Sequence, residues 1–288
     1  GKIKIGFISG YFRQHSVGRL MVGLISQIPK DLFEVVIITN RGQRDPISKI
    51  IESMADKILY LSDKIFQTQE DIGESQLDVL FYADIGMDIR TYFLAFARLA
   101  RTQCVFWGHP DTTGIPNIDY FLSSSLIEPR DGDQHYTETL RQFASLPTYY
   151  ARPDLPSRLK SRDEFGLSED QNLYLCPQSA IKFHPDIDNI FLQILESDQN
   201  SRLLVLEGAV KNWTSLIQNR WKRTIGRIGE RIDVIPRLQQ DDFLALQAIS
   251  DVILDTPHFS GGNTSYEAFS LSKPVVTLDG SFMRGRVT

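Results

Sequence analysis

The residue types best suited to binding a phosphate gather in one segment of the second half of the chain, between a strand-like run and a helical pattern. Small residues let the backbone approach a ligand, and the first N–H groups of a helix point at an anion in front of them. Hydroxyl groups add donors, and a carboxylate one turn into the helix can accept hydrogen bonds from a ribose. A tight turn with a capped helix would use the same residue types. The segment predicts a diphosphate and ribose loop formed by Gly261, Gly262, Asn263, Thr264, Ser265 and Glu267.

A lysine is expected at the same edge of the sheet. Lys182 follows the strand pattern Leu173–Cys176, and the carboxyl ends of parallel strands form the ligand-binding edge of an open α/β sheet. An ammonium group there can neutralise a departing diphosphate. The alternative is an ordinary solvated lysine.

Four histidines lie near expected strand ends. His15 stands at the first strand–helix junction, where a functional and a structural role are equally open, and His109 leads from a strand into a Gly/Pro-rich loop. His184 closely follows Lys182. His258 precedes the glycine pair, and we expect it to pack within the loop.

Several common nucleotide and catalytic motifs are missing. The glycines after the first strand do not form the dinucleotide-binding Gly-x-Gly-x-x-Gly, and neither a Walker-type Gly-Lys-Ser/Thr nor a Gly-x-Ser-x-Gly elbow occurs. Asp131 and Asp133 form an Asp-x-Asp in a turn-rich loop, which predicts a surface turn rather than a metal site. Asp186 and Asp188 suit a helix start without any metal. The sequence therefore predicts no metal ligands.

Composition narrows the class of protein. The 288 residues are 42% hydrophobic and 23% charged, which is typical of a globular chain, and the net charge of −5 disfavours nucleic-acid binding. No apolar run approaches the roughly 20 residues of a membrane helix. The only two cysteines, Cys104 and Cys176, lie in apolar runs and predict neither a disulfide framework nor a zinc site. We expect a reducing, cytoplasmic compartment.

Alternating strand and helix patterns predict an α/β protein with two doubly wound parallel sheets. The strands are expected at 2–9, 33–39, 58–61, 77–82, 103–107 and 120–123, then at 173–176, 203–206, 232–235, 252–254 and 275–278. Helices are expected near 17–28, 90–99, 186–196, 213–225, 240–249 and 264–271. A proline-rich stretch interrupts the pattern, so we predict domains at 1–150 and 171–288 joined by a linker at 151–170, with a ligand cleft between them.

Several stretches, in order along nearly the whole chain, resemble one family: the O-GlcNAc transferase/SPINDLY glycosyltransferases (family 41), especially bacterial members that usually follow tetratricopeptide repeats. The first-half stretches are Lys4-Ile-Gly-Phe-Ile-Ser, Phe12-Arg-Gln-His-Ser-Val-Gly-Arg-Leu-Met, Leu77-Asp-Val-Leu-Phe-Tyr-Ala-Asp and Gln103-Cys-Val-Phe-Trp-Gly-His-Pro-Asp-Thr-Thr-Gly with Ile118-Asp-Tyr-Phe. The second-half stretches are Cys176-Pro-Gln-Ser-Ala-Ile-Lys-Phe-His-Pro, Arg231-Ile-Asp-Val-Ile-Pro-Arg-Leu and Leu254–Gly280.

The resemblance implies a GT-B fold of two Rossmann-like domains, with the acceptor side in the first domain and the donor bound mainly by the second. It implies inverting, metal-independent transfer from a nucleoside-diphosphate sugar, most simply UDP-linked, with no other cofactor. Lys182 matches the diphosphate-contacting lysine, and His15 matches a histidine that positions or deprotonates the acceptor. The implied donor-binding set is Gln178, Arg237, Leu238, Phe243, Gly261, Gly262, Asn263, Thr264, Ser265 and Glu267. The implied acceptor and sugar region is His109, Thr112, Thr113 and Gly114.

The chain also departs from the family pattern. Gly262 and Asp78 stand where animal enzymes carry histidines, Phe243 stands near another, and Gln178 matches only if one residue is inserted. The expected activity is transfer of GlcNAc, glucose or fucose to a protein Ser, Thr or Asn. A GT-B epimerase and a non-catalytic nucleotide-sugar-binding module remain alternatives. We expect the second domain to be incomplete, because GT-B domains send a final helix back across the first.

Overall fold

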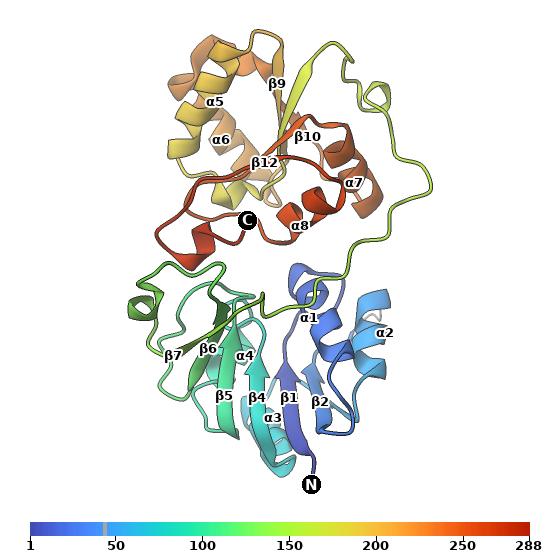
Figure 1. Ribbon diagram of the computed structural model, residues 1–288, viewed down its shortest axis with the longest axis vertical. Coiled ribbons are helices and arrows are strands. Elements are labelled where there is room, and N and C mark those ends of the chain that lie inside the picture. Colours follow the sequence, from blue (N-terminus) through green and yellow to red (C-terminus); the bar gives the residue numbers. More distant parts are fainter. Residues whose placement is uncertain (43–44) are drawn as a thin grey trace. The chain divides into compact units, whose positions relative to one another are not determined.

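The computed structural model describes residues 1–42 and 45–288, and it divides the chain into two compact units, Gly1–Ala151 and Arg152–Thr288. Each unit is built on a sheet in which every strand pair is parallel (Figure 1). This confirms the expected fold class of two parallel α/β sheets. No helix among the described residues combines the length and apolar character needed to cross a membrane.

The first unit contains a seven-stranded sheet in the order β3-β2-β1-β4-β5-β6-β7. The order reverses between β1 and β4, which creates the switch point at which open α/β sheets bind ligands. Its strands are β1 (Ile3–Ile8), β2 (Phe33–Thr39), β3 (Lys57–Tyr60), β4 (Leu77–Tyr82), β5 (Ala100–Phe106), β6 (Tyr120–Ser124) and β7 (Thr139–Phe143). Its helices are α1 (Ser16–Ser26), α2 (Pro46–Ser53), α3 (Ile65–Glu74), α4 (Ile89–Leu94) and the 3₁₀ turn η1 (Gly132–His135).

The apolar pattern explains the first elements. The residues Val35–Ile38 of β2 are all buried, as expected when both faces of a parallel sheet are covered. In α1 the buried residues Val17, Leu20 and Met21 recur at helical spacing. The helix begins after His15, whose side chain accepts a hydrogen bond from the Val17 N–H.

The second unit contains a five-stranded sheet in the order β10-β9-β8-β11-β12, with its own reversal between β8 and β11. The strands are β8 (Asn172–Cys176), β9 (Ser201–Leu206), β10 (Ile232–Ile235), β11 (Val252–Leu254) and β12 (Val275–Val276). The helices are α5 (Asp186–Ser197), α6 (Lys211–Thr224), α7 (Gln240–Ile249) and α8 (Asn263–Ser270). The 3₁₀ turns are η2 (Asp163–Phe165), η3 (Ala180–Lys182), η4 (Gly226–Arg231) and η5 (Met283–Gly285).

Side chains of the second sheet point alternately to its two faces and pack into two separate hydrophobic cores. Leu173 and Leu175 of β8 pack with Leu246 of α7 on one face. Cys176 of the same strand packs with Phe191 of α5 and Trp221 of α6 on the other. The sheet is therefore covered by α7 and α8 on one face and by α5 and α6 on the other, which fixes the loops at its carboxyl edge.

Several segments differ from the sequence expectations. The helix expected at 90–99 ends at Leu94, and α2 and α3 are not among the helices expected from the sequence. The edge strand β7 (Thr139–Phe143) was not expected, because its polar, largely exposed residues show no apolar run. Strand β12 ends at Val276, two residues earlier than expected. Within the expected linker 151–170, the Arg162 guanidinium donates to the Ile249 and Gln171 carbonyls, so this part belongs to the second unit.

Candidate functional site

The glycine loop of the second unit is held in shape by one buried carboxylate. Asp255 follows β11, and its Oδ1 accepts hydrogen bonds from the Gly261 N–H at 2.7 Å and the Thr256 N–H at 2.8 Å. Its Oδ2 accepts from the Thr277 hydroxyl at 2.8 Å. Both carboxylate oxygens are therefore occupied by partners within the protein, so Asp255 shapes the loop rather than facing a ligand.

The two glycines have different surroundings. A Cβ on Gly261 would lie 2.1 Å from Ser265 Oγ and 2.7 Å from Gln178 Nε2, so only glycine fits there. A Cβ on Gly262 would meet nothing closer than Val287 Cγ1 at 3.9 Å. Gly262 is the N-cap of α8 and gives that helix no side-chain cap. Open space therefore lies at a helix N-terminus, where an anion is favoured.

Lys182 reaches this loop from the neighbouring strand. Its Nζ donates to the Ser260 carbonyl at 2.6 Å and to Gln178 Oε1 at 3.1 Å, and the ammonium stands 4.4 Å from the centre of the Phe259 ring. Gln178 in turn donates from Nε2 to the Thr264 hydroxyl at 2.9 Å. Strands β8 and β11 are paired, so this network joins the loops that follow two adjacent strands. We call Gln178, Lys182, Ser260, Gly261 and Thr264 the cradle.

The charge of Lys182 is only partly compensated within the protein. Burial lowers the pKa of Lys182 to about 8, while the Asp255 carboxylate acts in the opposite direction. An ammonium group has three donors, and the two bonds above use neutral acceptors. A diphosphate would supply the opposite charge that this partly desolvated group lacks.

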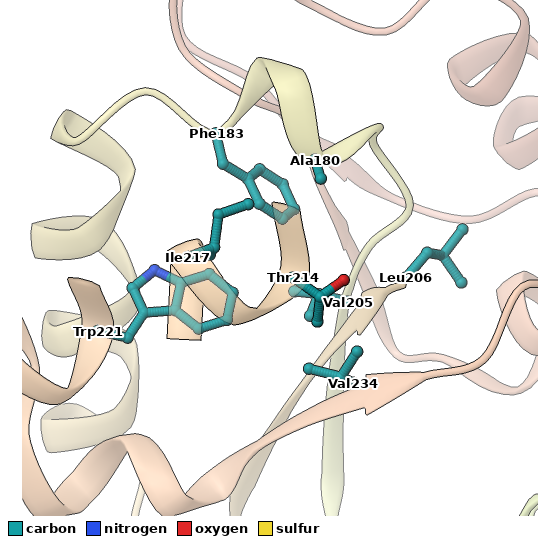
Figure 2. Close-up of a pocket in the computed structure, with 8 residues that line it drawn as sticks. All are labelled: Ala180, Phe183, Val205, Leu206, Thr214, Ile217, Trp221 and Val234. Carbon is teal, nitrogen blue, oxygen red and sulfur yellow. The ribbon is translucent and has the colours of Figure 1, made fainter. Parts of the chain in front are cut away.

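Apolar side chains around a small hollow pack against the turn that carries Lys182. Figure 2 shows Phe183 and Ala180 of this turn facing Ile217 and Trp221 of α6 and the side chains of β9 and β10. The hollow has a volume of only about 10 Å³, so it holds no ligand. The side chains that line the hollow pack turn η3 against the sheet.

The expected ribose acid lies one turn into α8. Glu267 is 2% exposed, and its Oε1 accepts from Gln240 Nε2 at 2.8 Å at the first residue of α7. Phe243 follows one turn later in α7 and is partly buried, Arg237 is exposed in the preceding loop, and Leu238 packs against the core of that face. The first turns of α7 and α8 are thereby brought together.

The remaining donor candidates lie in the first turn of α8. Asn263 is 9% exposed, and the Ser265 hydroxyl lies 2.8 Å from the Thr288 hydroxyl. Ser265 therefore ties the glycine loop to the last residues of the chain.

In the first unit, His15 lies at the carboxyl edge as expected. Its Nδ1 accepts from the Val17 N–H at 3.3 Å, and its ring stacks on Tyr11 with centroids 4.5 Å apart. Burial lowers the pKa of His15, and the positive charges of Arg13 and Arg19 lower it further. A neutral ring whose Nδ1 accepts carries its proton on Nε2. In this geometry Nε2 is the ring nitrogen of His15 that can donate a hydrogen bond.

A carboxyl group with a perturbed pKa lies at the same switch point. Asp84 follows β4 and is fully buried, its Oδ2 accepts from the Ser9 hydroxyl after β1 at 3.0 Å, and its Oδ1 has no partner among the described residues. Burial raises the pKa of Asp84 to about 7, with the Asp88 carboxylate adding to the effect. A carboxyl that titrates near neutral pH can exchange a proton with an acceptor.

The expected acceptor and sugar region is a loop fastened by a buried acid. The Thr112 hydroxyl donates to Glu138 Oε2 at 2.7 Å, and Thr113 donates to Oε1 through both its N–H and its hydroxyl. Burial raises the pKa of Glu138, but these hydrogen bonds outweigh it and the net shift is downward. The two threonine hydroxyls therefore hold the loop.

Glycine and histidine shape the rest of this region. Gly114 has a φ of 67°, which favours glycine, and a Cβ on Gly86 would lie 2.7 Å from the His109 ring. His109 is thereby packed against the loop that follows β4.

Known proteins of similar sequence cover the whole chain. No protein-family model matches it. It is 25% identical to the probable UDP-N-acetylglucosamine–peptide N-acetylglucosaminyltransferase SEC of Arabidopsis thaliana, over 99% of this chain and 30% of that protein. It is also 25% identical to the corresponding probable enzyme SPINDLY of the same plant, over 97% of this chain and 31% of that protein. The chain thus spans about three tenths of the length of these curated relatives.

The same similarity holds in three dimensions. A lysine-to-methionine variant of the O-GlcNAc transferase of Thermobaculum terrenum superposes with a TM-score of 0.86 and 25% identity, over 99% of this chain and 54% of that one. In sequence and in fold, this chain is similar to the catalytic region of O-GlcNAc transferase/SPINDLY glycosyltransferases. Its two Rossmann-like units are those of a GT-B fold, as the sequence resemblance implied.

The structure brings Gln178, Lys182, Gly261 and Thr264 into one network, while the assigned roles of all site residues stay predictions. Sequence reasoning missed Asp84 and Glu138. For Asp84 a signal existed, because an aspartate directly follows the strand Leu77–Tyr82. The sequence holds no such signal for Glu138, because Thr112 and Thr113 are distant in sequence and only the fold brings them next to it.

Proposed function

We propose that the chain forms the donor-binding and catalytic region of a glycosyltransferase that moves a sugar from a nucleoside-diphosphate sugar to a protein side chain. The observation that carries this proposal is the Lys182 ammonium, fastened to Ser260 and Gln178 beside the open N-terminus of α8. The relatives are named as transferases that use UDP-N-acetylglucosamine and peptides, which supports a UDP-linked donor and a protein acceptor.

The donor end of the reaction needs stabilisation of a departing diphosphate. Lys182 supplies a positive charge, α8 supplies its N-terminal N–H groups, and Thr264 supplies a hydroxyl. Glu267 would accept hydrogen bonds from the ribose in exchange for its bond to Gln240, and the Phe243 ring would stack on the base. Because these groups can bear the leaving-group charge, we propose transfer that needs neither a metal nor another cofactor.

The acceptor end is assigned to the first unit. We propose direct displacement at the anomeric carbon with inversion, in which the acceptor hydroxyl or amide attacks and the nucleoside diphosphate leaves. His15 donates from Nε2 and orients the acceptor, because its Nδ1 is already used by the Val17 N–H. Asp84 is the better proton acceptor of the two, since its carboxyl has one oxygen without a partner. His109 and the Thr112–Gly114 loop border this side.

The resemblance to the relatives also suggests the sugar, the acceptor and the companion domains of the full-length protein. The sugar would be GlcNAc, glucose or fucose and the acceptor a Ser, Thr or Asn side chain. We propose that tetratricopeptide repeats accompany this region in the full-length protein and select its acceptors. Both cysteines are free and buried, which fits the cytoplasmic location that we propose.

A product assay tests the proposed function. The chain is incubated with UDP-GlcNAc, UDP-glucose or GDP-fucose and a peptide library, and products are identified by mass spectrometry. We expect glycosylated peptide and free nucleoside diphosphate, both absent with Lys182→Met. Conversion of the sugar without an acceptor would instead show an epimerase. Saturable nucleotide binding without turnover under any acceptor would show a binding module.

A further inference from the structure

A cluster of metal-binding side chains joins the same two loops at a different place. His184 lies between η3 and α5, Asp186 is the first residue of α5, and His258 lies in the loop before the glycine pair. Asp186 Oδ2 is 2.7 Å from His258 Nε2 and 3.3 Å from His184 Nδ1. The two imidazole rings meet edge to face with centroids 4.6 Å apart. Among the described residues, this is the one group of three such side chains whose ligand atoms all lie within 4.8 Å of one another.

The spacing suits a small transition-metal ion. Ligand atoms about 2.0–2.1 Å from a tetrahedral zinc ion lie about 3.3 Å from one another. Two separations in this cluster are 2.7 and 3.3 Å and all lie within 4.8 Å, so rotations of the exposed side chains suffice to surround an ion. Two imidazole nitrogens and one carboxylate oxygen match zinc and its neighbours, whereas magnesium and calcium prefer oxygen ligands alone.

The atoms of the cluster are also placed to act as ligands. His184 Nδ1 accepts from the Asp186 N–H at 3.3 Å, so in this geometry that nitrogen carries a lone pair. The Asp186 side chain is 60% exposed and directs Oδ2 at His258 Nε2. An arriving cation would replace the proton between His258 and Asp186.

We propose that His184, Asp186 and His258 form a binding site for a divalent transition-metal ion of the zinc class. The three side chains are 52%, 60% and 56% exposed, so ions can enter and a fourth ligand can come from water. The metal-binding step does not depend on the proposed sugar transfer, and none of the three residues has a role in it.

The site acts as a clamp between two loops of the cradle. His184 lies two residues after Lys182, and His258 lies two residues before Ser260, the residue that accepts the Lys182 hydrogen bond. An ion shared by His184 and His258 fixes the loop after β8 to the loop after β11. It thereby holds Lys182 against the start of α8.

Titration of the tag-free, chelator-treated chain with ZnCl₂ tests the site. We expect one ion per chain by calorimetry and a rise in melting temperature with Zn²⁺ that Mg²⁺ does not produce. His184→Ala and His258→Ala should each weaken binding by at least about tenfold, with unchanged circular dichroism. His135→Ala, in the first unit, is the matched control and should bind as the wild type. Absence of saturable Zn²⁺ binding, or equal binding by all variants, would overturn the proposal.

Two further readouts test the ligand set and the clamp. Co²⁺ in place of Zn²⁺ should give the visible absorption of a tetrahedral nitrogen–oxygen site in the wild type and lose it in His258→Ala. Hydrogen exchange should slow in both loops when Zn²⁺ binds. Slowing in one loop alone would contradict the clamp, and a spectrum that survives His258→Ala would contradict the ligand assignment.

Discussion

Lys182 combines a positive charge with partial burial, and this combination is what a diphosphate site requires. Its two bonds within the protein go to neutral oxygens, so the charge is positioned but not neutralised. A lysine on an open surface would be compensated by water and would gain less from a diphosphate. The position of Lys182 followed from the strand pattern before it, whereas its burial depends on the Ser260 loop, which is distant in sequence.

The pH dependence of UDP binding reports on Lys182. Because burial lowers its pKa to about 8, the free protein loses this charge as the pH rises through that value. We expect UDP affinity to fall between pH 7 and pH 9. Lys182→Met should bind UDP about 100-fold more weakly at pH 7, because it loses a charge-assisted hydrogen bond together with the positive charge. Its UDP affinity should not fall between pH 7 and pH 9. Calorimetric titration at both values measures this, and equal pH profiles would contradict the assignment.

Asp84 makes stability depend on pH in the opposite sense to an ordinary aspartate. Its folded pKa of about 7 lies above its usual value of 3.8, so the folded state holds a proton that the unfolded state has lost. This favours folding at low pH, and the advantage is lost as the pH rises towards 7. Asp84→Asn removes the titration. Between pH 5 and pH 8, the variant should gain about 2–3 kcal/mol of unfolding free energy relative to the wild type.

Urea unfolding of both proteins at the two pH values measures this difference. The wild type alone is not informative, since other groups titrate over the same range. A constant difference between the two proteins would show that Asp84 does not titrate in the folded state over this range, and it would contradict the raised pKa.

At the scale of elements, the cradle arises from the pairing of β8 with β11. Their following loops meet because parallel neighbours end at the same edge, which the sequence pattern was sufficient to predict. The roles of the two glycines could not be separated in the same way. Only the fold shows that Gly261 lies against Ser265 and Gln178 while Gly262 faces open space.

Alanine substitution of each glycine tests this distinction. Gly261→Ala places a methyl group against Ser265 Oγ and Gln178 Nε2, so we expect about 1–3 kcal/mol of destabilisation and a clear loss of UDP affinity. Gly262→Ala meets no close atom and should change stability by no more than about 0.5 kcal/mol. Thermal unfolding and UDP titration of both variants provide the measurement. Equal effects would mean that the loop has a different conformation.

Neighbouring acids on α5 likewise differ in a way that the sequence could not show. Both Asp186 and Asp188 were interpreted as helix-start charges. Asp188 is buried and accepts from Arg220 at 2.8 and 2.9 Å and from Trp221 Nε1 at 2.9 Å, which fastens α5 to α6. Asp186 is exposed and meets His258 instead.

Replacing each of these acids by alanine should therefore give unequal results. Asp188→Ala leaves the partly buried Arg220 guanidinium and the buried Trp221 Nε1 without their acceptor, so about 3–5 kcal/mol of stability should be lost. Asp186→Ala should leave the urea midpoint almost unchanged in metal-free buffer, because its ion pairs are exposed to solvent. Urea unfolding of the two variants decides the matter, and similar losses would be inconsistent with the buried network.

At the scale of the whole molecule, the alternation of strands and helices predicted both parallel sheets and most of their strands. What escaped prediction were elements without an apolar signal, such as the edge strand Thr139–Phe143, and contacts between distant segments, such as Thr112 and Thr113 with Glu138. The proposed donor and acceptor residues fall in separate compact units. We therefore propose that the second unit binds the diphosphate, independently of the acceptor.

A crystal structure of the chain with UDP would locate the diphosphate. We expect a diphosphate oxygen within about 3 Å of Lys182 Nζ, others at the first N–H groups of α8 and the Thr264 hydroxyl, and the ribose at Glu267. A diphosphate bound away from Lys182 and the Gly261–Gly262 loop, or a cradle left empty at saturating UDP, would contradict it.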